Sequence, residues 1–318
     1  MKIVVIGGTG HIGTYLIPRL IMAGHEVICV SRQTREPYTV HPLWKLVRQV
    51  TIDRVAAEEK GTFGSQVKEL KGEIVIDLIC FTPQSAAMLA EALMGEVQHF
   101  IHCGTIWVHG HSEQVPTRES QERKPLCEYG SNKAKIESCL LSMFRQKGFP
   151  VTILHPGHIT GPGWLPINPA GNLDPEIFIK LAKGQQIVLP NLGMETLHHV
   201  HADDVAQAFC NAVENRQSAI GQGFHIVSEQ ALTLRGFAMA MAKWYGQEPK
   251  LGFLPWEEWK KTTSQKNADL TWDHIAHSPN ASIEKAKNLL KYNPRYSSLQ
   301  AIQEAMNHYF AKEHIQAS

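Results

Sequence analysis

The sequence predicts an α/β protein built on a doubly wound parallel sheet. Over the first half of the chain, short apolar runs rich in β-branched residues alternate with helical patterns, and the first run, residues 3–6, ends abruptly in glycines. Such alternation is typical of parallel strands joined by right-handed crossovers. The run at residues 73–81 is almost continuously apolar, as expected for a strand covered by helices on both faces.

Length, composition and charge limit the classes of protein to consider. The 318 residues can bury a large core in one large or two closely packed domains. The net charge of +1 gives no electrostatic reason to expect nucleic acid as a partner. No apolar run is long enough to span a membrane, and the first strand begins at residue 2, where a signal peptide would have its charged region. We therefore expect a cytoplasmic protein with no membrane or nucleic-acid partner.

A glycine-rich turn follows the first strand. Gly7, Gly10 and Gly13 stand three residues apart, and a helical pattern continues to about Ala23, where Gly24 ends it. Turns without Cβ atoms let the backbone approach a pyrophosphate, and the helix N-terminus offers it free N–H groups. The turn therefore predicts a dinucleotide site. The residues expected to contact the dinucleotide here are Gly7, Thr9, Gly10, His11, Ile12 and Gly13.

The second expected strand, residues 26–30, ends at Ser31 and Arg32, with Arg35 close behind. A carboxylate at this strand end would bind the 2′-hydroxyl of the adenine ribose and repel a 2′-phosphate. Because a small hydroxyl and guanidinium groups stand there instead, Ser31 and Arg32 favour NADP over NAD as the cofactor.

The remaining elements of the first half follow the same alternation. We expect a strand at residues 46–52, a broken helix at 55–70, a helix at 84–94, a strand at 99–103 and a helix at 128–144. Beyond Trp164 the alternation fades, and the next thirty residues are rich in proline and glycine.

Three residues carry a candidate chemistry. Tyr129 and Lys133 lie four apart on the expected helix 128–144 and so share a face. A phenol ordinarily ionises near pH ~10, and a neighbouring ammonium favours the phenolate. Tyr129 is therefore the candidate general acid/base. Thr105, at the end of strand 99–103, is placed to donate a hydrogen bond to the same substrate oxygen.

The cysteines and histidines do not predict a metal site. The six cysteines include no C-x-x-C pair. His198, His199 and His201 lie close in sequence, and period-two spacing puts His199 and His201 on one strand face, but no carboxylate or cysteine set completes a ligand shell. We read them as strand and pocket histidines and expect no metal.

Together these features resemble the short-chain dehydrogenase/reductase superfamily, in its extended branch of NAD(P)-dependent epimerase/dehydratase-like proteins. The resemblance covers nearly the whole chain. The matching segments are residues 7–13 (GGTGHIG), 105–110 (TIWVHG), Tyr129 with Lys133, 155–163 (HPGHITGPG), 200–206 (VHADDVA) and 285–294 (KAKNLLKYNP).

The resemblance implies a Rossmann-type fold and roles for individual residues. Thr105, Tyr129 and Lys133 match the catalytic triad, in which the lysine also binds the nicotinamide ribose. Asp53 occupies the position that binds the adenine amino group, and Pro156 lies in a segment expected to contact the cofactor. In this superfamily the helix that carries Tyr129 often joins a dimer interface, so the resemblance implies a homodimer.

Departures from the family pattern narrow the range of substrates to expect. Sugar-nucleotide members carry arginines that grip the diphosphate, whereas this chain has Leu197 before residues 200–206, no arginine in residues 274–282, and His155 in place of an arginine. A nucleotide-diphosphate sugar is therefore less expected than the resemblance alone suggests. Thr105 is followed by Ile106 and not by the acidic pair of the dehydratases, so net redox and epimerisation are the reactions left open.

These observations lead to a domain division and a function. We expect residues 1–163, with 196–227, to form the dinucleotide-binding domain, and residues 164–195 and 228–318 to form a substrate-binding lobe. The expected function is NAD(P)-dependent hydride transfer at a hydroxyl or carbonyl carbon of a small polar substrate, sugar-like compounds included. The alternative is a nucleotide-sensing or RNA-associated relative that lacks turnover.

Overall fold

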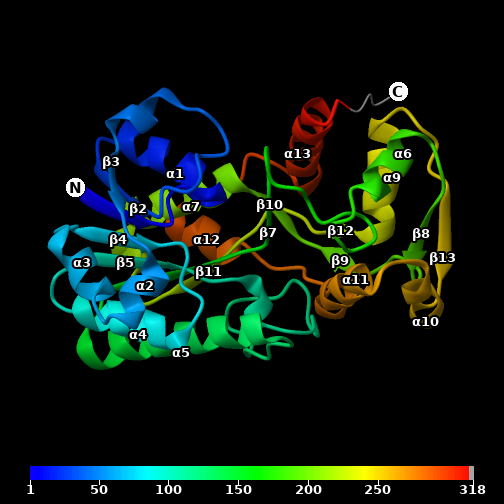
Figure 1. Cartoon of the computed structure of the whole chain (residues 1–318). Coiled ribbons are helices and arrows are strands. Elements are labelled where there is room, and N and C mark those ends of the chain that lie inside the picture. The colour runs from blue at the N-terminus through cyan, green and yellow to red at the C-terminus, as the bar shows by residue number, and fades with distance from the viewer. Residues whose placement is uncertain (315–318) are drawn as a thin grey trace.

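A computed structural model describes residues 1–314 and confirms the expected fold class (Figure 1). Seven parallel strands form one sheet in the order β11-β6-β5-β4-β1-β2-β3. Their bounds are β1 Lys2–Ile6, β2 Glu26–Ser31, β3 Arg48–Thr51, β4 Ile74–Asp77, β5 His99–Cys103, β6 Val151–Pro156 and β11 Gly223–Ile226.

Helices cover both faces of the sheet because successive strand residues point to opposite sides. In β1, Ile3 and Val5 join one core, and Val4 and Ile6 join the other. The first face is covered by α1 (His11–Met22), α7 (Ala202–Glu214) and α12 (Glu284–Leu290). The second is covered by α2 (Arg54–Glu59), α3 (Phe63–Glu69), α4 (Pro83–Ala92) and α5 (Glu128–Lys147).

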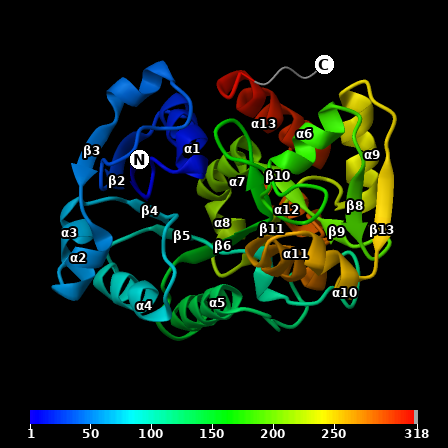
Figure 2. The same ribbon diagram turned by 45° about the vertical axis from the view of Figure 1, so that its right-hand side comes forward.

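A smaller lobe with its own core lies beside the sheet domain (Figure 2). Its core contains Phe178, Phe237 and Phe310, all at most 5% exposed. A short parallel pair, β8 with β13, which the sequence did not predict, forms part of it. The elements are α6 Glu176–Ala182, β8 Ile187–Pro190, α9 Leu234–Trp244, β13 Leu251–Leu254, α10 Trp256–Trp259, α11 Gln265–His277 and α13 Ser298–Lys312.

Two short strand pairs lie between the sheet and the lobe. They are β7 (His158–Thr160) with β10 (His199–His201), and β9 (Thr196–Leu197) with β12 (Leu232–Thr233). Residues 281–292 lie in sequence between α11 and α13 of the lobe, yet Ile283, Ala286 and Leu290 pack in the core of the sheet domain. The division between the two parts therefore differs there from the one expected, because the apolar face of α12 is buried against β11 and α7.

The order of the strands places a crevice at their carboxyl ends. The chain runs outward from β1 through β2 to β3, and then crosses to β4 on the other side of β1. The loops after β1 and β4 therefore diverge, and ligands of open α/β sheets bind in the resulting crevice. None of the helices within residues 1–314 combines the length and the apolar character needed to cross a bilayer.

Candidate active site

A cavity of about 400 Å³ lies in the crevice at the carboxyl ends of the sheet strands. Its walls come from the glycine turn after β1, the loop after β4, the end of β5, the first turns of α5 and the end of β6. The residues that line it are Gly7, Gly10, His11, Ile12, Gly13, Arg35, Leu78, Ile79, Phe81, Cys103, Gly104, Thr105, Tyr129, Lys133, Pro156, Gly157, Ile159 and Trp164. The glycine turn and all three candidate catalytic residues thus share one cavity.

The glycines of the turn are required by its geometry. Gly7 has φ +82°, which side chains other than glycine rarely adopt. A Cβ on Gly13 would lie 2.0 Å from the carbonyl oxygen of Gly8, so α1 packs directly on the turn. Gly10 precedes α1 without any side-chain hydrogen bond to the first helical turn. The N–H groups of that turn are therefore available to an anion, as a dinucleotide pyrophosphate requires.

Helix α5 brings Tyr129 close to the loop that follows β5. The helix starts behind Cys127, whose thiol accepts a hydrogen bond from the Gly130 amide at 3.4 Å. A Cβ on Gly130 would lie 2.7 Å from the carbonyl oxygen of Trp107. The glycine therefore permits the close approach that puts Tyr129 beside Thr105.

Lys133 lies one helical turn further on and is only 2% exposed. Its ammonium donates to the carbonyl oxygens of Cys80 at 2.8 Å and Cys103 at 2.6 Å. The first carbonyl belongs to the loop after β4 and the second to the last residue of β5. Burial lowers the pKa of Lys133 below its ordinary value. The ammonium thus joins two strand ends directly under the cavity.

The phenol of Tyr129 has the expected hydrogen-bond partner, Thr105, but its pKa is raised and not lowered. Although the residue as a whole is 43% exposed, burial raises the pKa of the phenol, and a hydrogen bond with Thr105 opposes this. The Lys133 ammonium lies 5.9 Å from the centre of the Tyr129 ring, and it is occupied by two carbonyls. The pKa of Tyr129 is therefore raised, chiefly by burial, and not lowered by Lys133 as expected.

Comparison with known proteins agrees with this geometry. The NAD dependent epimerase/dehydratase family matches residues 3–76 and 83–226. The chain belongs to this family. Its members use a nicotinamide dinucleotide, which the glycine turn fits.

Individual relatives are distant but cover most of the chain. The chloroplast stem-loop binding protein of 41 kDa b of Arabidopsis thaliana is 26% identical over 96% of this chain and 78% of its own length. The UDP-glucose 4-epimerase of Thermotoga maritima, solved with UDP-glucose, superposes with a TM-score of 0.74 at 20% identity, covering 98% of this chain and 100% of its own. The Bacillus cereus UDP-glucuronic acid 4-epimerase, in complex with UDP-glucuronic acid and NAD, gives 0.73 at 17% identity, with 98% and 100% covered.

Four residues that the family pattern or the sequence suggested for the cofactor do not line the cavity. Thr9 lies within the turn, and Asp53 accepts a hydrogen bond from Ala56 at the start of α2. Ser31 accepts one from the Gln33 amide at 3.1 Å. The fourth residue, Arg32, is exposed.

The cationic group that does line the cavity on this side is Arg35, which donates to the Tyr38 hydroxyl at 2.7 Å. Trp164 also lines the cavity, stacked on His11 with 5.1 Å between the ring centres. The sequence offered no signal for Trp164, because its contact with His11 joins segments 153 residues apart.

The histidines that invited a metal interpretation are bonded to the main chain. His198 contacts Ser228 O at 3.0 Å and accepts from Ala281 N at 3.1 Å. His199 contacts Ile167 O at 3.1 Å. His201 accepts from the Asp203 amide at 3.0 Å, and its Nε2 lies 3.2 Å from Glu304 Oε2. Their polar contacts are those of structural histidines.

A different trio of potential ligands, Asp77, Cys80 and His102, does lie close together in the buried core. Arg54 donates to both carboxylate oxygens of Asp77, at 2.8 and 3.0 Å. Burial raises the pKa of the Cys80 thiol to about 11, which keeps it protonated. A divalent cation there would face two cations, Arg54 and Lys133, so we assign the trio a structural role.

Proposed function

We propose that the protein is an oxidoreductase or epimerase that transfers hydride at a hydroxyl or carbonyl carbon of a small polar substrate, with Tyr129 as the acid/base. The observation that carries the proposal is the shared cavity, in which Tyr129 and Thr105 face the glycine turn with Lys133 buried beneath. Family membership supports the reaction class.

In this mechanism each protein group has one task. In the direction of reduction, Tyr129 donates its phenolic proton to the substrate oxygen, and in oxidation it accepts that proton. Thr105 hydrogen-bonds the phenol and orients the same oxygen. Lys133, with two of its three N–H donors on main-chain carbonyls, would hold the nicotinamide ribose with the third. The bound nicotinamide supplies or accepts the hydride.

For the cofactor, we propose a preference for NADP. No carboxylate stands at the end of β2, where Ser31 and Arg32 lie, and Arg35 lines the cavity near the glycine turn. A guanidinium is suited to bidentate binding of a phosphate. The crystallised relative noted above carries NAD, so a titration with NADPH and NADH tests the preference.

For the substrate, the lining favours a small neutral compound, sugar-like molecules included. Arg35 and Lys133 are the cations that line the cavity, and Lys133 is occupied by two carbonyls. A nucleotide diphosphate usually needs bidentate clamps. Net redox and epimerisation both use this first hydride step.

The alternative is a regulator that binds the nucleotide, or an RNA-associated protein such as the stem-loop binding relative. The placement of Thr105, Tyr129 and Lys133 in one cavity argues for turnover. The net charge of +1 supplies no electrostatic attraction to RNA.

The Tyr129→Phe variant separates the two functions. Removing the phenolic hydroxyl should lower kcat roughly 100- to 10,000-fold, the usual contribution of a general acid/base, and leave NADPH affinity within about twofold. The measurement is NADPH oxidation on a panel of small aldehydes and ketones, with NADPH fluorescence for binding. Tyr309→Phe, on α13 of the lobe and outside the cavity lining, is the matched control. If Tyr129→Phe keeps wild-type turnover, the acid/base assignment is wrong.

A further inference from the structure

The ring of His155, at the end of β6, touches the main chain of Thr105. The ring is fully buried. Its Nδ1 lies 3.2 Å from the amide nitrogen of Thr105 and 3.0 Å from the carbonyl oxygen of the same residue. Thr105 is extended, with φ −163° and ψ 150°, so its N–H and C=O point to the same side. One ring atom therefore reaches both polar groups of the Thr105 backbone.

The opposite edge of the ring is held by an ion pair. His155 Nε2 lies 3.2 Å from Glu137 Oε1, and Arg123 grips both oxygens of Glu137 at 2.7 and 2.9 Å. Arg123 in turn donates to the carbonyls of Glu119 and Gln121. Burial alone would raise the pKa of Glu137, but His155 and Arg123 lower it below its usual range. Glu137 is thus a carboxylate, and it favours a proton on Nε2 of His155.

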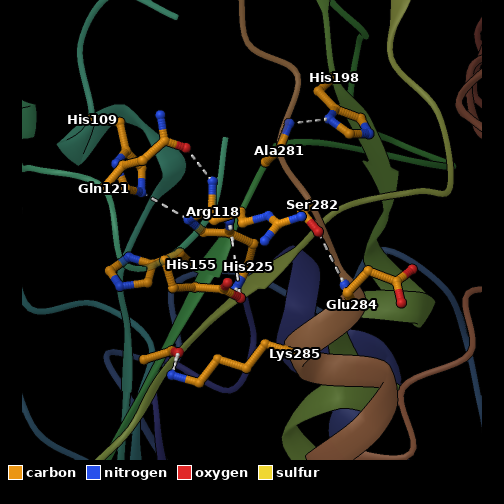
Figure 3. Close-up of polar contacts among 12 residues, drawn as sticks. His109, Arg118, Gln121, His155, His198, His225, Ala281, Ser282, Glu284 and Lys285 are labelled. Carbon is orange, nitrogen blue, oxygen red and sulfur yellow. Dashed lines mark hydrogen bonds and ion pairs between the residues drawn. The ribbon is translucent and has the colours of Figure 1, made fainter. Parts of the chain in front are cut away.

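Two glycines make room for the ring. A Cβ on Gly104 would lie 2.5 Å from His155 Nδ1. On the neighbouring strand, a Cβ on Gly223 would lie 3.3 Å from Nε2 and 3.2 Å from Glu137 Oε1. Figure 3 shows His155 beside His225, whose ring also contacts that of His109. The ring therefore occupies a slot that the adjoining strand ends leave open.

We propose that His155 is a positioning residue that fixes the Thr105 backbone and thereby directs the Thr105 hydroxyl toward Tyr129. The ring donates its Nε2–H to Glu137, and its Nδ1 holds the Thr105 backbone either by accepting the Thr105 N–H or, when Nδ1 carries a proton, by donating to the Thr105 carbonyl oxygen. The Thr105 Oγ1 accepts from the Trp107 amide at 3.3 Å, so its own proton points elsewhere, toward the phenol. The inference rests on the proposed function for its kinetic consequence, but the contact itself does not.

Two isosteres of histidine test each edge of the ring separately. In His155→Asn the side-chain amide replaces Nδ1, which retains the contact with Thr105 and removes the one with Glu137. In His155→Gln the amide replaces Nε2, which retains the contact with Glu137 and removes the one with Thr105. With NADPH and a carbonyl substrate that the wild type turns over, kcat should fall at least tenfold in His155→Gln and less than threefold in His155→Asn. The KM for NADPH should stay within twofold in both.

The amide resonance of Thr105 in ¹⁵N TROSY spectra supplies a readout that does not depend on turnover. It should shift strongly in His155→Gln and little in His155→Asn. If the wild type turns over no carbonyl compound but the resonance behaves in this way, the proposed function fails and the positioning contact stands. An unmoved resonance in His155→Gln, or equal losses of kcat in the two variants, would overturn the positioning role.

A double-mutant cycle distinguishes action through Thr105 from general damage to the fold. In a Thr105→Val background, His155→Gln should lower kcat less than twofold further, because the hydroxyl it positions is gone. A tenfold further loss would contradict the inference.

If His155→Gln does not fold, Gly104→Ala displaces the ring from Thr105 while keeping the histidine. It should give the same loss of kcat and the same shift of the Thr105 resonance. A Gly104→Ala protein with wild-type kcat would also overturn it.

Discussion

The two walls of the cavity hold their side chains by different means. On the α5 wall, Lys133 lines the cavity and Glu137 lies one helical turn behind it; both are at most 5% exposed, and their polar atoms are bonded to carbonyls or to an ion partner. On the wall at the glycine turn, His11 and Trp164 line the cavity and Tyr38 packs behind them, with the centres of the three rings 5.1 to 5.8 Å apart. Trp164 is 45% exposed there.

The difference predicts which step of the reaction each wall controls. Hydrogen bonds in a buried network need particular distances and angles, so the α5 wall holds its groups in one geometry. Aromatic pairs tolerate a range of ring positions and contribute only about 0.5–1.5 kcal/mol each beyond burial. We therefore expect changes on the α5 wall to alter kcat, and changes on the glycine-turn wall to alter cofactor affinity.

The largest effect is expected for Lys133→Met. The change strands the carbonyls of Cys80 and Cys103 without a donor, which costs about 1–3 kcal/mol of unfolding free energy, and it removes the ammonium beneath Tyr129. Turnover should fall on the order of 100-fold, with weaker NADPH binding. Urea unfolding and steady-state kinetics measure these effects, and the exposed Lys135→Met on the same helix is the control. A Lys133→Met protein with wild-type stability would show that the two carbonyl bonds contribute little.

On the opposite wall, Arg35→Ala should weaken NADPH binding about tenfold or more, since hydrogen bonds from a charged group contribute roughly 1.5–3 kcal/mol. NADH affinity and kcat should change little. Arg32→Ala is the matched control, because Arg32 is exposed like Arg35 but does not line the cavity. Fluorescence titration with both nucleotides gives the answer. A larger effect at Arg32 than at Arg35 would favour the assignment made from the sequence alone.

Acid should destabilise the protein, and His11 on the glycine-turn wall contributes to the effect. Burial lowers the pKa of His11 to about 3, and His201 acts in the same direction. A histidine in the unfolded chain ionises near pH ~6.5, so below that pH the unfolded state binds more protons. The His11 contribution to stability is complete above pH ~6.5 and is lost as the pH falls toward about 3.

The His11→Phe variant tests this predicted loss of stability at low pH. The phenyl ring keeps an aromatic contact with Trp164 but has no titratable group. In urea unfolding at pH 7.5, 6.5 and 5.5, the variant should lose less stability on acidification than the wild type, by up to about 1.4 kcal/mol per pH unit below 6.5. An unchanged slope would mean that His11 is protonated in the folded chain.

The parts of the site that lie close in sequence could be predicted, and those that join distant segments could not. The strand, glycine turn and helix at residues 2–22, and the face shared by Tyr129 and Lys133, follow from local periodicity and sterics. The same spacing continues to Glu137, but its partner His155 lies 18 residues away on β6. That contact depends on how α5 packs across the sheet, which no local pattern encodes.

At the cofactor end of the cavity, too, contacts between distant segments could not be predicted from the sequence. The end of β2 was predicted from its composition, yet the guanidinium that reaches the cavity is that of Arg35. Which of two neighbouring arginines points inward depends on the path of the loop at residues 32–41, and that path is set by contacts such as the Tyr38 amide with Thr14 Oγ1 at 3.0 Å. The parallel pairing of β8 with β13 was missed for a similar reason, because these strands are about 60 residues apart.

The smallest effect, and the most direct test of the comparison, is expected for Trp164→Ala. The change removes one stacked contact with His11 and an edge contact with Tyr38. At about 1 kcal/mol for such a contact, NADPH affinity should fall about fivefold, whereas kcat should fall less than threefold. Trp272→Ala, which removes a similarly exposed tryptophan from α11 in the lobe, is the control. If Trp164→Ala lowers kcat as much as Lys133→Met does, the aromatic wall holds the reacting groups as firmly as the hydrogen-bonded one, and the division of roles between the two walls is wrong.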